Sequence, residues 1–129
     1  MQDQPEPREI LATVAAFLRD TVVPESRPRT AFQARVAANA IDLVSRQITL
    51  AGASDAAERT CLAHLLGADL PLAEANAALA DEIAKGAADV TTPGLLDHLL
   101  ATTLAKLAVD QPTYSGYCAA LADAPVAKD

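Results

Sequence analysis

Apolar side chains recur along this chain every three or four residues, the spacing that places them on one face of a helix. The first such series lies within residues 7–22 and consists of Leu11, Val14, Ala15, Leu18 and Val22. Pro7 suits the start of a helix, because a first-turn N–H has no partner inside the helix. The pattern therefore predicts a helix over residues 7–22, followed by a stiff linker over residues 24–29 (PESRPR).

The same pattern, together with residues that begin and end helices, predicts four more helices. The longest is expected from about residue 30 to 50, with Thr30 as its N-cap and Gly52 just beyond its end. The next three are expected over residues 54–67, 71–86 and 92 to about 111. Pro112 ends the last of them, since proline cannot continue the helical hydrogen bonds. A turn and about one further turn of helix are expected after it.

The composition supports a helical fold with a core of small side chains. Thirty of the 129 residues are alanine and only four are aromatic. Alanine and leucine favour helices, whereas the residue types that favour strands are sparse. The predicted fold class is all-α, a single compact antiparallel bundle of about five helices. The length suits one domain over residues 1–129, with residues 1–6 and 124–129 as loose ends.

Two segments, residues 32–40 (FQARVAANA) and 102–117 (TTLAKLAVDQPTYSGY), place polar side chains on or beside an apolar helical face. On a helical wheel, Asp110 falls in the predicted buried face, at a helix end where the dipole disfavours an anion. The leucines that define this face are Leu96, Leu99, Leu100 and Leu107. We therefore expect its carboxylate to point inward and to be neutralised by Lys106, or by Arg35 or Arg46. The predicted polar cluster is Arg35, Asn39, Thr103, Lys106, Asp110 and Tyr114.

This cluster has two interpretations, apart from the one in which its members are unconnected and solvated. In the first, it is a structural network that fixes how two helices and the closing turn meet. In that case Asp110→Ala would destabilise the fold by about 2–4 kcal/mol, because it strands a buried cation. In the second, the same residues form the polar floor of a ligand pocket. An enzyme that uses Lys106 or Asp110 as a general base is the third and least supported alternative.

The remaining reactive side chains predict no catalytic or metal site. Cys61 and His64 share a helix face, but zinc needs three or four ligands, so a packing or surface role is expected. His98 is expected to lie opposite the buried face of its helix, in solvent. Cys118 has small or apolar neighbours, which is typical of an ordinary thiol. We therefore expect no catalytic residue, no metal and no cofactor.

Charge and hydropathy limit the classes of partner that this protein can bind. The net charge of −7 argues against binding to nucleic acid or to an anionic membrane, since both need a basic surface. There is no apolar run of about twenty residues, and the first residues lack a signal-peptide pattern. These features predict a cytoplasmic protein that does not cross a membrane.

Three segments carry a family resemblance: the opening MQDQPEPREILATVAAFL, FQARVAANAIDLV at residues 32–44, and residues 102–117. Through them the chain resembles a small bacterial family of uncharacterised helical domains, a domain of unknown function. The family is met beside or fused to aminoglycoside-phosphotransferase-like kinases and near acyl-CoA dehydrogenases. Its motif positions correspond here to Phe32, Arg35, Asn39, Thr103, Lys106, Asp110, Pro112 and Tyr114. A histidine often stands in the family where this chain has Gln33, so that position is not an essential acid, base or metal ligand.

The resemblance implies an association with such enzymes and implies no reaction. The predicted function is a non-catalytic accessory or interaction domain that works with a phosphotransferase-like or acyl-CoA-metabolising enzyme. The alternative is a small-molecule or acyl-group binding module whose pocket floor is the polar cluster. Helices rich in alanine can also leave an apolar face for self-association, so a homo-oligomer is a further expectation.

Overall fold

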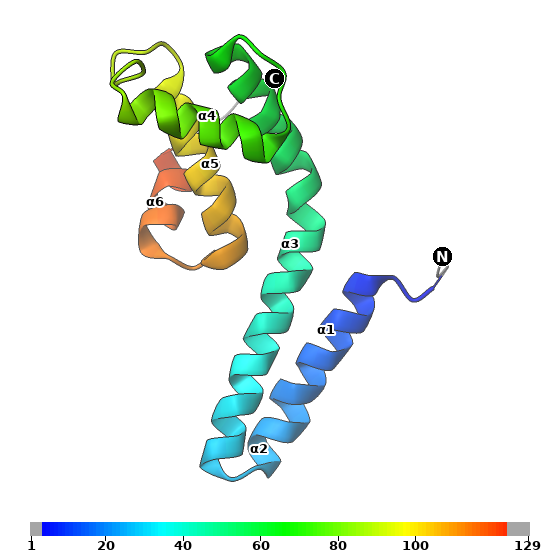
Figure 1. Cartoon of the computed structure of the whole chain (residues 1–129). Coiled ribbons are helices and arrows are strands. Elements are labelled where there is room, and N and C mark those ends of the chain that lie inside the picture. The colour runs from blue at the N-terminus through cyan, green and yellow to red at the C-terminus, as the bar shows by residue number, and fades with distance from the viewer. Residues whose placement is uncertain (1–3, 124–129) are drawn as a thin grey trace. The chain divides into compact units, whose positions relative to one another are not determined.

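The computed structural model describes residues 4–123, which form helices and, within that range, no β-strand (Figure 1). The all-α prediction is confirmed. The chain divides into two compact units, Met1–Ala51 and Gly52–Asp129, and each is described by itself. That residues 1–129 act as one domain stays a prediction. Of the predicted loose ends, residues 1–3 and 124–129 lie outside the described range.

Unit 1 begins with a helix at the predicted proline. Helix α1 spans Pro7–Phe17, and the backbone N–H of Glu6 donates to the Glu9 carboxylate at 2.8 Å, which caps its first turn. The chain then continues through a π-helical turn, η1 (Leu18–Val22), into the short α2 (Val23–Glu25). The predicted linker is therefore shorter than expected, because helical structure passes Pro24 and resumes at Pro28.

Within unit 1, α1 and the first part of α3 lie side by side and antiparallel (Figure 1). The buried apolar residues described in this unit are all alanines: Ala15, Ala31, Ala34 and Ala38. Small side chains let two helix backbones approach closely, but they remove little apolar area from water. A polar link supplements this packing, since the Arg19 guanidinium pairs with the Asp42 carboxylate and donates to the Asn39 side-chain oxygen at 3.3 Å.

Helix α3 runs without a break over Pro28–Leu66. The predicted interruption at residues 51–53, with Ser54 capping a new helix, is therefore wrong. Gly52 does not adopt a positive φ, and a Cβ at this position would meet no atom within 4 Å. A glycine inside a helix costs only about 1 kcal/mol relative to alanine, which the flanking helix-forming residues offset. The boundary between the two units falls inside this helix.

Unit 2 contains the rest of α3, then α4 (Leu72–Ala84), α5 (Leu95–Asp110) and α6 (Ser115–Asp123). The predicted positions of α4 and of the end of α5 are confirmed to within a few residues. Helix α5 begins three residues later than predicted, because Gly94 adopts a φ of +82° directly before it. Helix α6 is longer than the single turn that the sequence predicted.

The core of unit 2 is built from leucines. Leu62 of α3 is fully buried and packs with Leu79 of α4 and Leu95 of α5. Partly buried leucines surround this centre: Leu65, Leu66, Leu70 and Leu72. None of the helices in the described range is both long enough and apolar enough to cross a bilayer.

Candidate functional site

The six residues of the predicted polar cluster are divided between the two units. Unit 1 holds Arg35 and Asn39, whereas unit 2 holds Thr103, Lys106, Asp110 and Tyr114. Within unit 2, Thr103, Lys106 and Asp110 follow one another along α5 at helical spacing. The cluster as a whole stays a prediction.

The local surroundings of these side chains differ from the expectation. Asn39 is exposed and accepts its hydrogen bond from Arg19. The Thr103 hydroxyl donates to the Leu99 carbonyl at 2.7 Å, which is a bond within its own helix. Arg35, Lys106 and Tyr114 are also exposed.

Asp110 is exposed as well, so the prediction that its carboxylate points inward is wrong. The prediction failed because it assigned the wrong face of α5 to the interior. Three of the four leucines of the predicted buried face of α5, Leu96, Leu99 and Leu100, are exposed, and the fourth, Leu107, is half-buried. The inward face instead comprises Leu95, His98, Thr102, Ala105 and Val109, one residue earlier at each turn. The loss of stability expected for Asp110→Ala therefore no longer follows.

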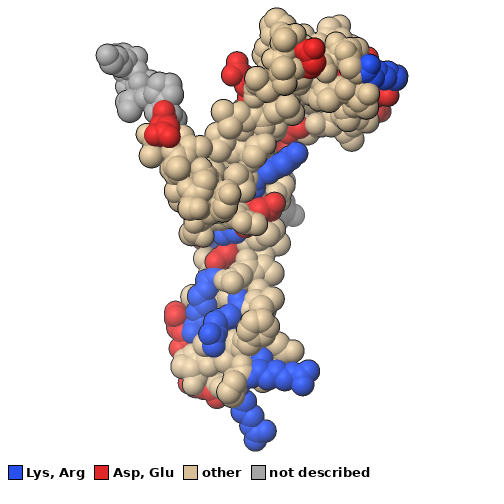
Figure 2. Space-filling model, turned by 90° about the vertical axis from the view of Figure 1, so that its left-hand side faces the viewer, with Lys and Arg blue, Asp and Glu red and all other residues tan. Residues whose placement is uncertain are grey.

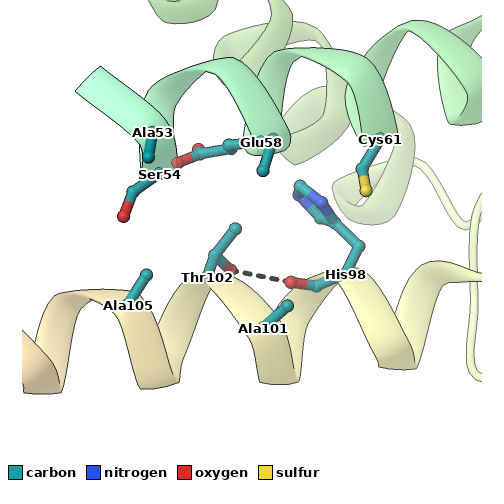
Figure 3. A pocket seen from close by; sticks show the side chains of 9 residues that line it. Ala53, Ser54, Glu58, Cys61, His98, Ala101, Thr102 and Ala105 are labelled. Atoms are coloured by element: carbon teal, nitrogen blue, oxygen red, sulfur yellow. Dashed lines mark hydrogen bonds between the residues drawn. The ribbon is translucent and has the colours of Figure 1, made fainter. Parts of the chain in front are cut away.

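A different group of polar side chains comes together between α3 and α5, entirely inside unit 2 (Figure 3). They line a pocket of about 300 Å³. Its lining residues are Ala53, Ser54, Ala57, Glu58, Cys61, His98, Ala101, Thr102 and Ala105. The spacing of three and four residues on each helix explains why these side chains face one another.

His98 is the central polar residue of this pocket. Its side chain was expected in solvent but is only 4% exposed, so that prediction is wrong. Its ring extends from α5 toward α3, between Glu58 and Cys61 (Figure 3). Among the described residues, its Nδ1 atom is the one buried side-chain polar atom without a hydrogen-bond partner. Such an atom costs the fold about 1–3 kcal/mol and calls for an explanation.

Two other polar groups of the pocket already form hydrogen bonds within the protein. The Thr102 hydroxyl donates to the His98 carbonyl at 2.9 Å, shown dashed in Figure 3. The Glu58 carboxylate accepts from the Asn76 amide at 2.7 Å. Cys61 is an exposed free thiol. Within residues 4–123 there is no group of three or more His, Cys, Asp or Glu side chains suited to hold a metal ion.

Sequence reasoning missed this pocket because it ranked the helix faces by leucine content. The lining face of α5 contains alanine, threonine and histidine, so it looks polar and small beside the leucines. The available signal was the matching three-and-four spacing of Ser54, Glu58 and Cys61 on one helix and of His98, Thr102 and Ala105 on the other. Reading residues 30–50 and 54–67 as two separate helices also hid the continuity of α3.

Unit 1 presents a second candidate surface, formed by five exposed apolar side chains. They are Ile10, Val14 and Phe17 on α1 and Val44 and Ile48 on α3, and each is between 40% and 57% exposed. Glu6, Pro7 and Arg8 line one shallow hollow together with Ile48 and Thr49, which places the start of α1 beside this part of α3.

The spacing of these side chains groups them on each helix. Ile10, Val14 and Phe17 follow one another at intervals of four and three residues on α1, so they lie along one face of that helix. Val44 and Ile48 lie four residues apart on α3, so they also share a face. We call the five residues the hairpin apolar face.

No curated protein and no solved structure matches this chain. Residues 24–114 match the model of a family described as a domain of unknown function (DUF6285), and these residues are well over half of the chain. They include all six residues of the predicted polar cluster, and both Glu58 and His98 of the pocket. The chain therefore belongs to the DUF6285 family of domains of unknown function.

Proposed function

We propose that this protein is a non-catalytic accessory domain that binds a partner protein through the hairpin apolar face. The observation that carries the proposal is the exposure of five apolar side chains on two adjacent helices, grouped at helical spacing on each of them. Grouped exposed apolar residues mark binding sites more often than scattered ones do. A helix of the partner laid along the hairpin would complete a three-helix arrangement.

The energetics favour such a contact. Apolar surface contributes about 25 cal/mol for each Å² removed from water. Phe17 is the largest side chain of the face and its one aromatic ring, and aromatic residues are frequent anchors of interfaces. Because the core of unit 1 consists of alanines, the largest apolar side chains of this unit remain available to a partner.

The charge of unit 1 is compatible with a protein partner. Its first 51 residues contain six acidic and six basic residues, so the net charge of −7 belongs to residues 52–129. Figure 2 shows basic side chains gathered at the end of the hairpin where α2 meets α3. Arg27 and Arg29 are exposed there and would form a polar rim beside the apolar face.

The partner class rests on the family resemblance alone. It implies an aminoglycoside-phosphotransferase-like kinase or an acyl-CoA dehydrogenase. We therefore expect the protein to co-purify with a kinase-like or dehydrogenase enzyme encoded beside it, and to do so without altering the enzyme's chemistry.

The test compares two phenylalanine variants. Phe17→Ser removes the one aromatic ring of the hairpin apolar face, whereas Phe32→Ser removes an equally large exposed ring about 120° around α3 from Val44. Phe17→Ser should weaken binding to the partner enzyme by about tenfold or more, and Phe32→Ser should leave it nearly unchanged. Affinity is measured by calorimetry, with circular dichroism as the check on folding.

Equal binding by Phe17→Ser and wild type would refute the proposed face. Sedimentation equilibrium of the protein alone adds a second outcome. A dimer that Phe17→Ser dissociates and Phe32→Ser does not would assign the face to a second copy of this chain, and the accessory role would then be wrong as stated.

The alternative from the sequence is a small-molecule or acyl-group binding module with Arg35, Asn39, Lys106 and Asp110 as its pocket floor. It predicts that acyl-CoA raises the melting temperature, and that Lys106→Ala abolishes the rise. A melting temperature that acyl-CoA, nucleotides and carboxylic acids all leave unchanged would eliminate it.

A further inference from the structure

The pocket between α3 and α5 contains chemistry that a protein-docking role does not use. We propose that it binds a small organic amine, with the amino group held by the Glu58 carboxylate and a short apolar chain lying between alanine walls. The proposal concerns unit 2 alone, so its test is independent of the test of the hairpin apolar face.

The hydrogen-bonding groups of the pocket select a donor. Glu58 presents a carboxylate, which only accepts hydrogen bonds and has about four lone-pair directions. The Asn76 amide occupies one of them at 2.7 Å, so capacity for further donors remains. The Thr102 hydroxyl already donates to a backbone carbonyl, so it offers the ligand an acceptor oxygen. An ammonium group, which carries up to three N–H donors, complements this set.

His98 supplies the second reason to expect a ligand. Its ring is 96% buried in the pocket wall, and its Nδ1 atom has no partner among the described residues. Buried polar atoms in folded proteins nearly always have a partner, so an exception calls for an explanation, and a bound molecule is one. A neutral imidazole has one acceptor nitrogen, which a ligand N–H can satisfy.

The charge of the pocket argues against an anionic ligand. None of its nine lining residues is lysine or arginine, whereas Glu58 places a carboxylate among them. A phosphate or carboxylate in this pocket would face that carboxylate without an opposing cation. The net charge of −7 carried by residues 52–129 works in the same direction, because it attracts cations to this unit.

The walls and volume define the rest of the ligand. Ala53 on α3 lies across the pocket from Ala101 and Ala105 on α5 (Figure 3), and Ala57 also lines it, so the walls between the polar groups are apolar. A pocket of about 300 Å³ is at the lower end of the range for small-molecule sites. It therefore suits a primary amine with a short alkyl chain, rather than a nucleotide or a sugar.

The two cysteines provide a built-in measurement. Cys61 lines the pocket, whereas Cys118 lies outside it, and both are exposed free thiols. The alkylation rate of each thiol by iodoacetamide is followed by mass spectrometry of the intact, full-length protein. Pentylamine, pentanoate and pentan-1-ol serve as probes of equal chain length and different charge. Amide shifts in NMR spectra locate the binding independently.

Pentylamine should slow the alkylation of Cys61 several-fold, leave Cys118 unchanged, and shift amides of α3 and α5. Pentanoate should change neither the alkylation rate of Cys61 nor the amide spectrum. Glu58→Gln keeps an oxygen for Asn76 but removes the charge, so it should weaken pentylamine binding by about tenfold or more. Glu74→Gln, at an exposed carboxylate of α4, is the matched control and should bind as wild type does.

Three results would overturn the proposal. Pentanoate or pentan-1-ol could protect Cys61 as well as pentylamine does, pentylamine could leave Cys61 and the amide spectrum unchanged, or Glu58→Gln could bind like wild type. Ala101→Leu fills the pocket and should abolish binding. If circular dichroism shows that Ala101→Leu does not fold, the Glu58→Gln and Glu74→Gln pair decides the matter alone.

Discussion

At the scale of single residues, Asp89 shows how one carboxylate organises the turn that leads into α5. The Thr91 hydroxyl and backbone N–H both donate to its Oδ1 atom, at 2.6 and 2.8 Å. The backbone N–H of Asp89 in turn donates to the Thr92 hydroxyl at 3.0 Å. The bonds to the carboxylate, that of the Thr91 hydroxyl above all, lower the pKa of Asp89 below its usual value of 3.8.

We predict that Thr91→Val raises the pKa of Asp89 toward 3.8, because it removes the strongest donor. A pKa lowered by folding contributes stability above the unfolded value, and this contribution is lost as the pH falls through the lowered pKa. The variant should therefore lose less stability on acidification than wild type does. NMR titration of the carboxyl carbon measures the pKa. Thr103→Val, whose hydroxyl bonds only within α5, is the control, and an unchanged Asp89 pKa in Thr91→Val would contradict the prediction.

His98 illustrates what a single sequence hides at this scale. Histidine side chains are found both in protein interiors and on protein surfaces, so the residue type did not indicate whether this side chain is buried. Its burial follows from small neighbours, Ala101, Thr102 and Ala105, which let α5 approach α3. The sequence predicted a polar cluster from residues that the structure exposes, and the polar group that is buried was assigned to solvent.

His98→Leu should leave the free energy of unfolding unchanged or raise it by up to about 2 kcal/mol. The reason is that the substitution removes a buried polar atom that has no partner within the described residues and keeps apolar contacts. Leu62→Ala, at the fully buried centre of the unit 2 core, should instead lower it by about 2–5 kcal/mol. Urea unfolding measures both. A loss for His98→Leu as large as that for Leu62→Ala would mean that the imidazole is a structural group, satisfied in solution.

At the scale of helices, the sequence predicted most helix ends correctly. It also predicted a break in α3 that the structure does not contain. The start at Pro7 and the ends of α4 and α5 were predicted closely, because proline and left-handed glycine act locally. The break at Gly52 was wrong because a glycine inside a helix and a glycine after one look alike in sequence. The buried face of α5 was also misplaced, since a face is fixed by the neighbouring helix and not by its own leucines.

Two glycine substitutions distinguish a glycine inside a helix from a glycine that adopts a left-handed conformation at a helix end. Gly52→Ala should stabilise the protein by about 0.5–1 kcal/mol, because the position is helical and a Cβ meets no atom within 4 Å. Gly94→Ala should destabilise it by about 1 kcal/mol or more, because its φ of +82° strains any residue with a side chain. Thermal unfolding followed by circular dichroism compares the two. Destabilisation by Gly52→Ala would restore the predicted break in α3.

At the scale of the whole molecule, the two units differ in what holds them together and in charge. Unit 1 is neutral and its buried apolar residues, within the described range, are alanines, whereas unit 2 carries the net negative charge and buries leucines. Burying an alanine removes much less apolar area from water than burying a leucine does. The unit with the weaker core is also the one that displays the hairpin apolar face, so a partner would supply packing that its own core lacks.

Amide hydrogen exchange should therefore be uneven along the chain. Amides in the middle of α1 should exchange faster than those around Leu79 in α4, because local opening of the hairpin exposes few large apolar side chains. Mass spectrometry of peptides from the full-length protein measures this difference. Adding the partner enzyme should slow exchange in α1 and leave α4 unchanged, whereas Phe17→Ser should lose that protection. Protection of α1 equal to that of α4 in the free protein would show that the alanine packing of unit 1 holds the hairpin as firmly as the leucine core holds unit 2.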